Sequence, residues 1–170
     1  MIDLHPWTSA DAAVLERTVG DPRMMEHLGG VPESAEQIAR RHRQYVELRL
    51  PEASMFTVRL GDGTVTGSAG FWEHEWAGER VYEAGWMIFP EFAGRGIATQ
   101  AAIELVRRAS ACERNRYLHA FPGVTNAASN AVCARAGFVK LGECTVEFPK
   151  GRMMRSNDWR FDLYAARGEG

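Results

Sequence analysis

The sequence predicts an α+β domain built around a mixed sheet of seven strands. Residues 33–49 show the apolar spacing of an amphipathic helix, and residues 55–89 alternate between turn signals as an antiparallel meander does. Residues 81–121 then follow the order strand, helix, strand. Because a helical crossover joins neighbouring strands in parallel, this last unit makes the sheet mixed.

Composition is typical of a soluble protein of one domain. The 170 residues suit a single domain spanning 1–170, with 45% hydrophobic and 25% charged residues. No apolar run approaches the roughly 20 residues needed to cross a bilayer, and the polar residues 1–7 do not resemble a secretory signal. We therefore expect a cytoplasmic protein without a membrane partner.

Charge and cysteine content argue against two further classes. The 20 basic and 22 acidic residues give a net charge of −2, which argues against a nucleic-acid partner, and the basic strip at 40–43 is read as a solvated helix face. Three cysteines at wide spacing, without a compact Cys/His cluster, predict free thiols and no metal site.

Helical spacing dominates the first fifty residues, and strand alternation dominates the next forty. The predicted elements are, in order, a strand at 2–5, a capped helix at 8–19, a short helical piece at 21–28, a helix at 33–49 and strands at 55–60, 65–76 and 81–89. Gly61-Asp-Gly63 and Ala77-Gly78 are turn signals between the last three strands, which therefore form a meander.

The second half contains two helices and three strands. The predicted elements are a helix from Ile97 to about Ala109, a strand at 117–121, a helix from Asn126 to Gly137, and strands at 139–148 and 158–165 joined by residues 149–157. Ala98, Ala102 and Leu105 recur at helical spacing on one face of the first helix. Gly137-Phe138 has the residue order of a common helix end.

The stretch from Trp86 to Gln100 has the order strand, glycine-containing turn, helix. A helix start leaves several backbone N–H groups unpaired at the positive end of its dipole. Gly94-Arg-Gly96 would let a ligand approach these groups closely. The stretch therefore predicts a site for an anionic phosphate.

Two motifs in this order resemble the GNAT N-acetyltransferase superfamily. Residues 90–98 are similar to its acetyl-CoA motif, Arg/Gln-x-x-Gly-x-Gly/Ala, with Gly96 and Ala98 at the two small positions. Ala93 stands where the family usually has Arg or Gln. One contact to the phosphate is therefore missing, or it is replaced by Arg95 and the backbone. The second motif runs from Asn126 through Ser129 to Arg135-Ala-Gly-Phe138 and resembles the family's Asn-x-x-Ser helix.

The resemblance covers essentially the whole chain and is closest to the ribosomal-protein N-terminal acetyltransferases of the RimJ/RimL type. It implies a GNAT fold whose sheet is splayed between the fourth and fifth strands, with acetyl-CoA as co-substrate and no metal. The cofactor-binding residues that it implies are Met87, Ile88, Phe89, Gly94, Arg95, Gly96, Ile97, Ala98, Thr99, Asn126 and Ser129. The backbone N–H groups of Met87 and Phe89 are candidates for the pantetheine and the oxyanion.

Two residues are predicted to be catalytic. Glu83 is a carboxylate within an apolar strand, and burial would raise its pKa toward that of a general base; alternatively it pairs with an Arg. Ser129 is the candidate hydrogen-bond donor to the leaving sulfur, because Cys133 stands where many family members have Tyr. Helix capping is the alternative reading of both Asn126 and Ser129.

The acceptor is an amine, either of a protein N terminus or of a small molecule, and the sequence does not choose between them. Glu73, Glu75, Glu79 and Glu83 could attract a cationic amine, although solvated hairpin charge explains them equally well. The family's acceptor groove corresponds to about residues 21–50.

Other functions stay open at this stage. A non-catalytic acyl-CoA sensor, a longer acyl chain and a homodimer all fit the sequence. A different nucleotide-phosphate binder does not, because the chain has no Gly-x-x-x-x-Gly-Lys-Ser/Thr loop.

Overall fold

A computed structural model describes residues 1–165. The expected α+β class and the seven-stranded mixed sheet are confirmed. The strands are β1 (Ile2–Pro6), β2 (Ala53–Leu60), β3 (Val65–Trp76), β4 (Glu79–Ile88), β5 (Tyr117–Ala120), β6 (Val139–Glu147) and β7 (Met153–Asp162). The helices are α1 (Ala12–Glu16), α2 (Ala35–Glu47), α3 (Ile97–Ala111) and α4 (Ala127–Arg135), and a 3₁₀ turn covers Pro90–Phe92.

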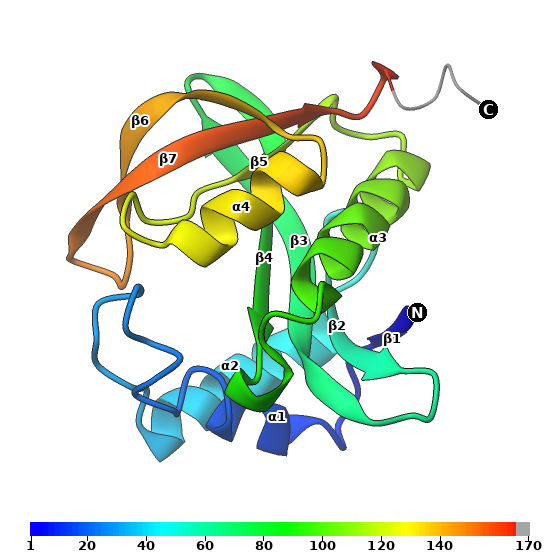
Figure 1. Cartoon of the computed structure of the whole chain (residues 1–170), viewed down its shortest axis with the longest axis vertical. Helices are drawn as coiled ribbons and strands as arrows, with labels where there is room; N and C mark the ends of the chain where they lie inside the picture. The colour runs from blue at the N-terminus through cyan, green and yellow to red at the C-terminus, as the bar shows by residue number, and fades with distance from the viewer. Residues whose placement is uncertain (166–170) are drawn as a thin grey trace.

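The strand order is β1-β2-β3-β4-β5-β7-β6. Strands β1 to β4 are antiparallel, β4 and β5 are parallel across the α3 crossover, and the β6–β7 hairpin completes the sheet beside β5. In Figure 1 the hairpin crosses the end of the molecule at a steep angle to β4. The sheet is thus divided into two parts that meet where β4 and β5 pair.

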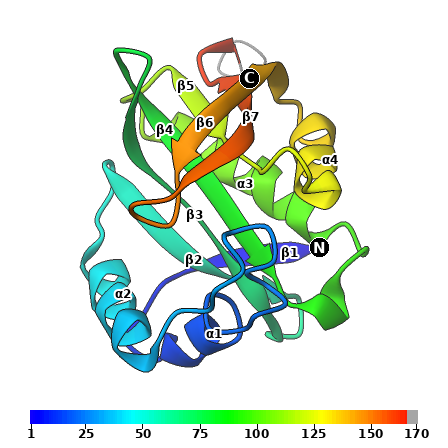
Figure 2. The ribbon, with the colours of Figure 1, turned by 90° about the vertical axis from the view of Figure 1, so that its left-hand side faces the viewer.

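Helices cover both faces of the sheet. Helices α3 and α4 pack on one face around Tyr82, Leu105 and Leu118, all fully buried. Helices α1 and α2 cover the other face around Leu15 and Met55. Figure 2 shows α1 and α2 on one side of the strands and α3 and α4 on the other. Because successive side chains of a strand alternate between faces, each side chain of β4 lies on one of these two faces of the sheet.

Local chemistry sets the element ends. Ser34 caps α2 in a capping box with Gln37, each side chain accepting a hydrogen bond from the other residue's backbone N–H. Gly137 (φ 89°) follows α4, and the N–H of Phe138 bonds the carbonyl of Cys133 at 3.0 Å, which is a Schellman end. Ala77 and Gly78 both have positive φ, as a tight hairpin turn requires.

Three predicted elements differ in the structure. The capped helix expected at 8–19 is only Ala12–Glu16, and Asp11 does not cap it, because its carboxylate accepts the Thr8 N–H at 2.7 Å instead. Residues 21–28 form successive turns rather than a helix, and the Asp21 carboxylate accepts the Arg23 N–H, which competes with helical bonding. Strand β7 begins at Met153 rather than at Asp158, because Glu147 to Gly142 of β6 pair with Met153 to Asp158. Cross-strand pairing, rather than apolar alternation, makes this segment a strand.

No helix within residues 1–165 is both long enough and apolar enough to span a bilayer.

Candidate active site

Strand β4 has one edge that is only partly paired. Its β3 edge is paired from Glu79 to Ile88, whereas its β5 edge is paired only at Tyr82 and Glu83. After β5 the chain no longer pairs with β4. It bonds to β7, where the Asn157 N–H donates to the Pro122 carbonyl at 2.9 Å. The sheet is therefore splayed after Glu83, as expected between the fourth and fifth strands.

Alternation along β4 decides which backbone groups face this opening. The Phe89 N–H donates to the Thr66 carbonyl of β3 at 2.8 Å. In an antiparallel pair, every second residue directs its N–H and C=O to the same neighbour, so Met87 also faces β3 and Ile88 and Trp86 face the opening. The prediction that the N–H groups of Met87 and Phe89 bind the ligand is therefore wrong by one residue along the strand. The Phe89 N–H is already bonded to β3, and the Met87 N–H points to β3 as well.

The turn after β4 presents bare backbone at the start of α3. Gly94 and Gly96 have φ of 73° and 75°, and nothing lies within 4 Å of a Cβ built on either residue. The first α3 bond runs from the Gln100 N–H to the Gly96 carbonyl at 3.1 Å, so the N–H groups of the first turn have no helical partner. No acidic residue occupies that turn. This arrangement suits an anion, as predicted.

The side chains of the turn are mostly exposed. Ile97 is buried and anchors the helix in the core, Ala98 and Thr99 are half-buried, and Ala93 and Arg95 are exposed. The Arg95 guanidinium lies 5.4 Å from the centre of the Phe92 ring, close to the glycines in the chain. Arg95 therefore supplies a cation beside the turn, where Ala93 supplies none.

Helix α4 begins on the other side of the opening. The Asn126 Oδ1 accepts the Ser129 N–H at 3.1 Å, so Asn126 is the helix cap. The Ser129 side chain is half-buried, and its hydroxyl has no hydrogen-bond partner among the described residues. Cys133, the alternative to Ser129, is fully buried in the core, and burial raises the pKa of its thiol to about 12. A thiol in this setting is a small core residue rather than a proton donor to the site.

Glu83 lies at the apex of the opening, on the α1/α2 face of the sheet. It is the last β4 residue paired with β5, and its side chain is 24% exposed. Burial raises the pKa of Glu83 to about 7, against a smaller lowering by a hydrogen-bonding interaction with Trp72. Its nearest cation-forming neighbour is His74, whose Nδ1 lies 3.5 Å from Oε2. The alternative reading, an Arg partner for Glu83, is not what the structure shows: none of the ion pairs among residues 1–165 joins Glu83 to an Arg.

The predicted group of hairpin carboxylates does not form one site. Glu73 lies on the opposite face from Glu83 and is bonded to Arg114 and to Asn115 at 3.1 Å. Glu75 is exposed and pairs with Arg80 at 3.4 Å. These two carboxylates are hairpin charge. Glu79 lies on the face of Glu83 but is exposed at the first residue of β4, away from the apex, so Glu83 is the carboxylate of this group that lies at the apex.

Sequence reasoning missed a buried network beside Glu83. His119, opposite Glu83 in β5, shares a hydrogen bond of 2.6 Å with Asp158, which also accepts the Trp76 Nε1–H at 2.9 Å. Phe121 stacks on His119 with ring centres 5.7 Å apart. Both His119 and Asp158 are more than nine-tenths buried. Their sequence positions are 39 residues apart, so only the pairing of β5 with β7 could have indicated the contact.

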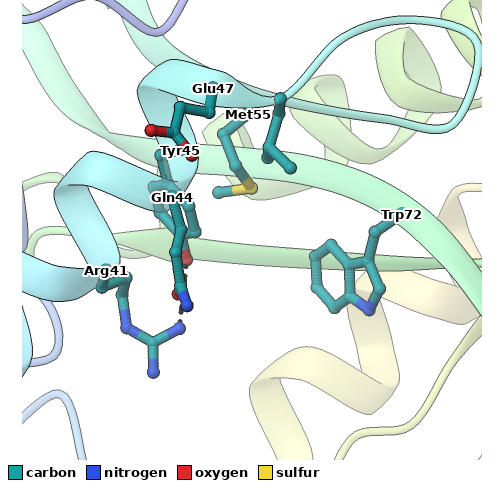
Figure 3. A pocket seen from close by; sticks show the side chains of 7 residues that line it. Arg41, Gln44, Tyr45, Glu47, Met55 and Trp72 are labelled. Carbon is teal, nitrogen blue, oxygen red and sulfur yellow. Dashed lines mark hydrogen bonds between the residues drawn. The ribbon is translucent and has the colours of Figure 1, made fainter.

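A cavity of about 460 Å³ opens on the same face, between α2 and the sheet. Its wall includes Arg41, Gln44, Tyr45 and Leu48 of α2 and its C-terminal end, Met55 of β2 and Trp72 of β3. In Figure 3 the Trp72 indole stands across the cavity from Tyr45 and Gln44, with Met55 behind them. The α2 residues of this wall fall within the range 21–50 from which an acceptor groove is expected, and that role stays a prediction.

No group of three or more His, Cys, Asp and Glu within residues 1–165 is arranged to hold a metal ion. His74, between two glutamates in the sequence, instead lies beside Glu83.

The site thus combines an open strand edge, a helix start with unpaired N–H groups at one end of it and a partly buried carboxylate at the other, and this is an arrangement that suits an acyltransferase. The family comparison agrees, because residues 2–139 match the acetyltransferase (GNAT) domain. The chain belongs to this family. A search of curated proteins returned no match.

Solved structures share the fold at low sequence identity. The spermidine N-acetyltransferase of Vibrio cholerae, in complex with CoA and spermine, is 17% identical over 96% of both chains, with a TM-score of 0.78. The aminoglycoside acetyltransferase AAC(6')-Ib, with coenzyme A and kanamycin, is 18% identical over 100% of both chains, also at 0.78. RimL, a ribosomal L7/L12 α-N-protein acetyltransferase, is 19% identical over 95% of this chain and 93% of its own, at 0.76.

Proposed function

We propose that this GNAT protein moves the acetyl group of acetyl-CoA to a primary amine by direct attack of the amine on the thioester. The observation that carries the proposal is the position of Glu83, a partly buried carboxylate of raised pKa at the point where the open edge of β4 begins. A base that titrates near neutral pH is suited to take a proton from an attacking amine.

The reaction needs a base for the amine proton, donors for the negative carbonyl oxygen and a donor for the departing sulfur, and the chain offers a group for each. In the proposal the amine nitrogen forms the new C–N bond, its proton passes to Glu83 directly or through water, and the C–S bond breaks. Backbone N–H groups on the open edge, those of Trp86 and Ile88, stabilise negative charge on the carbonyl oxygen. The Ser129 hydroxyl donates a hydrogen bond to the departing sulfur.

The start of α3 is assigned to the pyrophosphate. Open backbone at Gly94 and Gly96 and the unpaired N–H groups of the first α3 turn support this assignment. Arg95 adds a cation in place of the side chain that Ala93 lacks. The open edge of β4 would pair with the amide groups of the pantetheine arm as a strand does.

The acceptor is proposed to be a primary amine, from either a small molecule or a protein N terminus. Structural relatives named for spermidine, kanamycin and a ribosomal protein have acceptors of both kinds. The test is release of free thiol from acetyl-CoA in the presence of a panel of amines and peptides. Binding of acetyl-CoA without thiol release for any acceptor would contradict the proposal and favour an acyl-CoA sensor.

A further inference from the structure

The cavity beside α2 indicates what kind of acceptor the protein takes, because one of its wall residues, Trp72, also lies next to Glu83. Trp72 lines the cavity and is the direct cross-strand partner of Glu83. A Cβ built on Gly85 would lie 3.1 Å from the Trp72 Cη2, so the indole extends over β4 at the residue two positions after Glu83. Trp72 is therefore the side chain shared by the cavity wall and the surroundings of Glu83, and an acceptor that extends from the cavity toward Glu83 passes it.

The cavity wall is mainly apolar and aromatic. Tyr45, Leu48, Met55 and Trp72 provide side chains that pack with the core beneath α1 and α2. The Tyr45 ring is held edge-on against Trp7, with ring centres 5.3 Å apart. Rigid aromatic walls of this kind favour a flat or aliphatic molecular body.

The charges near the cavity are already used or are exposed. The Arg41 Nε donates to both oxygens of Glu33 at 3.0 Å, and its Nη1 donates to the Tyr45 hydroxyl at 3.4 Å. Gln44 and Glu47 lie at the exposed rim, where a carboxylate binds a cation only weakly. The cavity thus offers no buried carboxylate for a second ammonium group.

We propose that the acceptor is a monoamine with an apolar, uncharged body that fills the cavity between Trp72 and α2, rather than a polyamine or an aminoglycoside. This inference rests on the proposed amine acetylation. The same chemistry occurs in free arylalkylamines and in peptides whose N-terminal residue is apolar, and the experiment separates these two sources.

The experiment compares kcat/KM in a thiol-release assay for 2-phenylethylamine, a tetrapeptide beginning with Phe, spermidine and kanamycin. One of the first two should exceed both polycations by about tenfold or more. Preference for 2-phenylethylamine identifies a small-molecule acceptor, and preference for the peptide identifies a protein N terminus. Preference for spermidine or kanamycin overturns the inference but leaves the acetyltransferase function intact. Absence of thiol release with every acceptor overturns both.

A pair of variants tests the location. Leu48→Glu places a charge on the cavity wall, and Leu50→Glu makes the same change at a residue that is 56% exposed and outside the cavity. Leu48→Glu should raise KM for the preferred amine about tenfold and leave KM for acetyl-CoA within about twofold, whereas Leu50→Glu should change neither. If Leu48→Glu does not fold, Leu48→Gln makes the milder test. Equal effects at both positions would overturn the placement.

Discussion

Replacing Glu83 with Gln should change stability and activity in opposite directions. Burial holds the pKa of Glu83 at about 7 in the native protein, against an ordinary value of 4.5. Between these values the native state keeps a proton that the unfolded state has lost, so stability falls as pH rises through this window and is level above it. At 1.4 kcal/mol per pH unit, the loss is at most about 3.5 kcal/mol, less what the 24% exposure of the side chain relieves.

The Gln variant does not ionise and escapes that loss. It should therefore be more stable than the wild type at about pH 8, by up to about 3.5 kcal/mol, and about equal to it at pH 4. Guanidinium unfolding at the two pH values measures the difference. The exposed Glu75, paired with Arg80, is the matched control, and Glu75→Gln should show no such dependence on pH. Equal stability gains at both pH values would refute the argument from burial.

Activity should respond in the other direction. A carboxylate base works only when deprotonated, so kcat/KM of the wild type should rise with pH and level off above about 7. Glu83→Gln should lower kcat by about 10²-fold to 10⁴-fold and remove that midpoint. His74, 3.5 Å away, also titrates on this face, and burial lowers its pKa with a further contribution from His119. If kcat/KM of the Gln variant still rose with pH with a midpoint near 7, the pH dependence would belong to another group, and Glu83 would be refuted as the base.

Four further outcomes are expected. Gly96→Val should weaken acetyl-CoA binding by about tenfold or more in calorimetry. Gly78→Val strains an equally open positive-φ glycine in the β3–β4 turn, at the opposite end of β4, and should lose about 1–2 kcal/mol of stability without affecting binding. Ser129→Ala should lower kcat with little change in stability, and an unchanged kcat would remove Ser129 from the mechanism. Cys133→Ser should cost about 1–3 kcal/mol in thermal unfolding by burying a hydroxyl, and unaltered kcat would confirm a core role. Asp158→Ala should cost about 3–5 kcal/mol, because it leaves the buried His119 and the partly buried Trp76 indole without their partner, and a loss below 1 kcal/mol would contradict this account.

Sequence periodicity predicted the elements whose burial is one-sided or whose ends carry a chemical signal. The meander, the α3 crossover and the Gly137 helix end all follow from local residue patterns. The start of β7 did not follow from such a pattern, since residues 153–157 combine an exposed Met153 with buried polar Ser156 and Asn157. This segment becomes a strand only through pairing with β6. The alternation of apolar and polar residues in a sequence reflects which side chains are buried. The β6–β7 hairpin is only partly buried, so its sequence carries little of this alternation.

The candidate site shows the same limit. Glu83 and the glycines of the α3 start were found because each is unusual at its own position in the chain. The sequence did not show which β4 amides point toward the open edge, because this depends on which residue of β3 pairs with Phe89. Cavity residues such as Tyr45 and Trp72 look like ordinary core residues in sequence, and only the packing of α2 on the sheet places them beside Glu83.

The single strand β4 carries both the carboxylate and the open edge, and this has a consequence for how the protein can be changed. The spacing between Glu83 and the turn at Gly94 is fixed by covalent geometry and by continuous pairing with β3. Helix α2 contributes to the cavity but to neither of these. Exchanging residues of α2 should therefore alter the range of amines accepted, while the groups proposed to bind acetyl-CoA keep their positions.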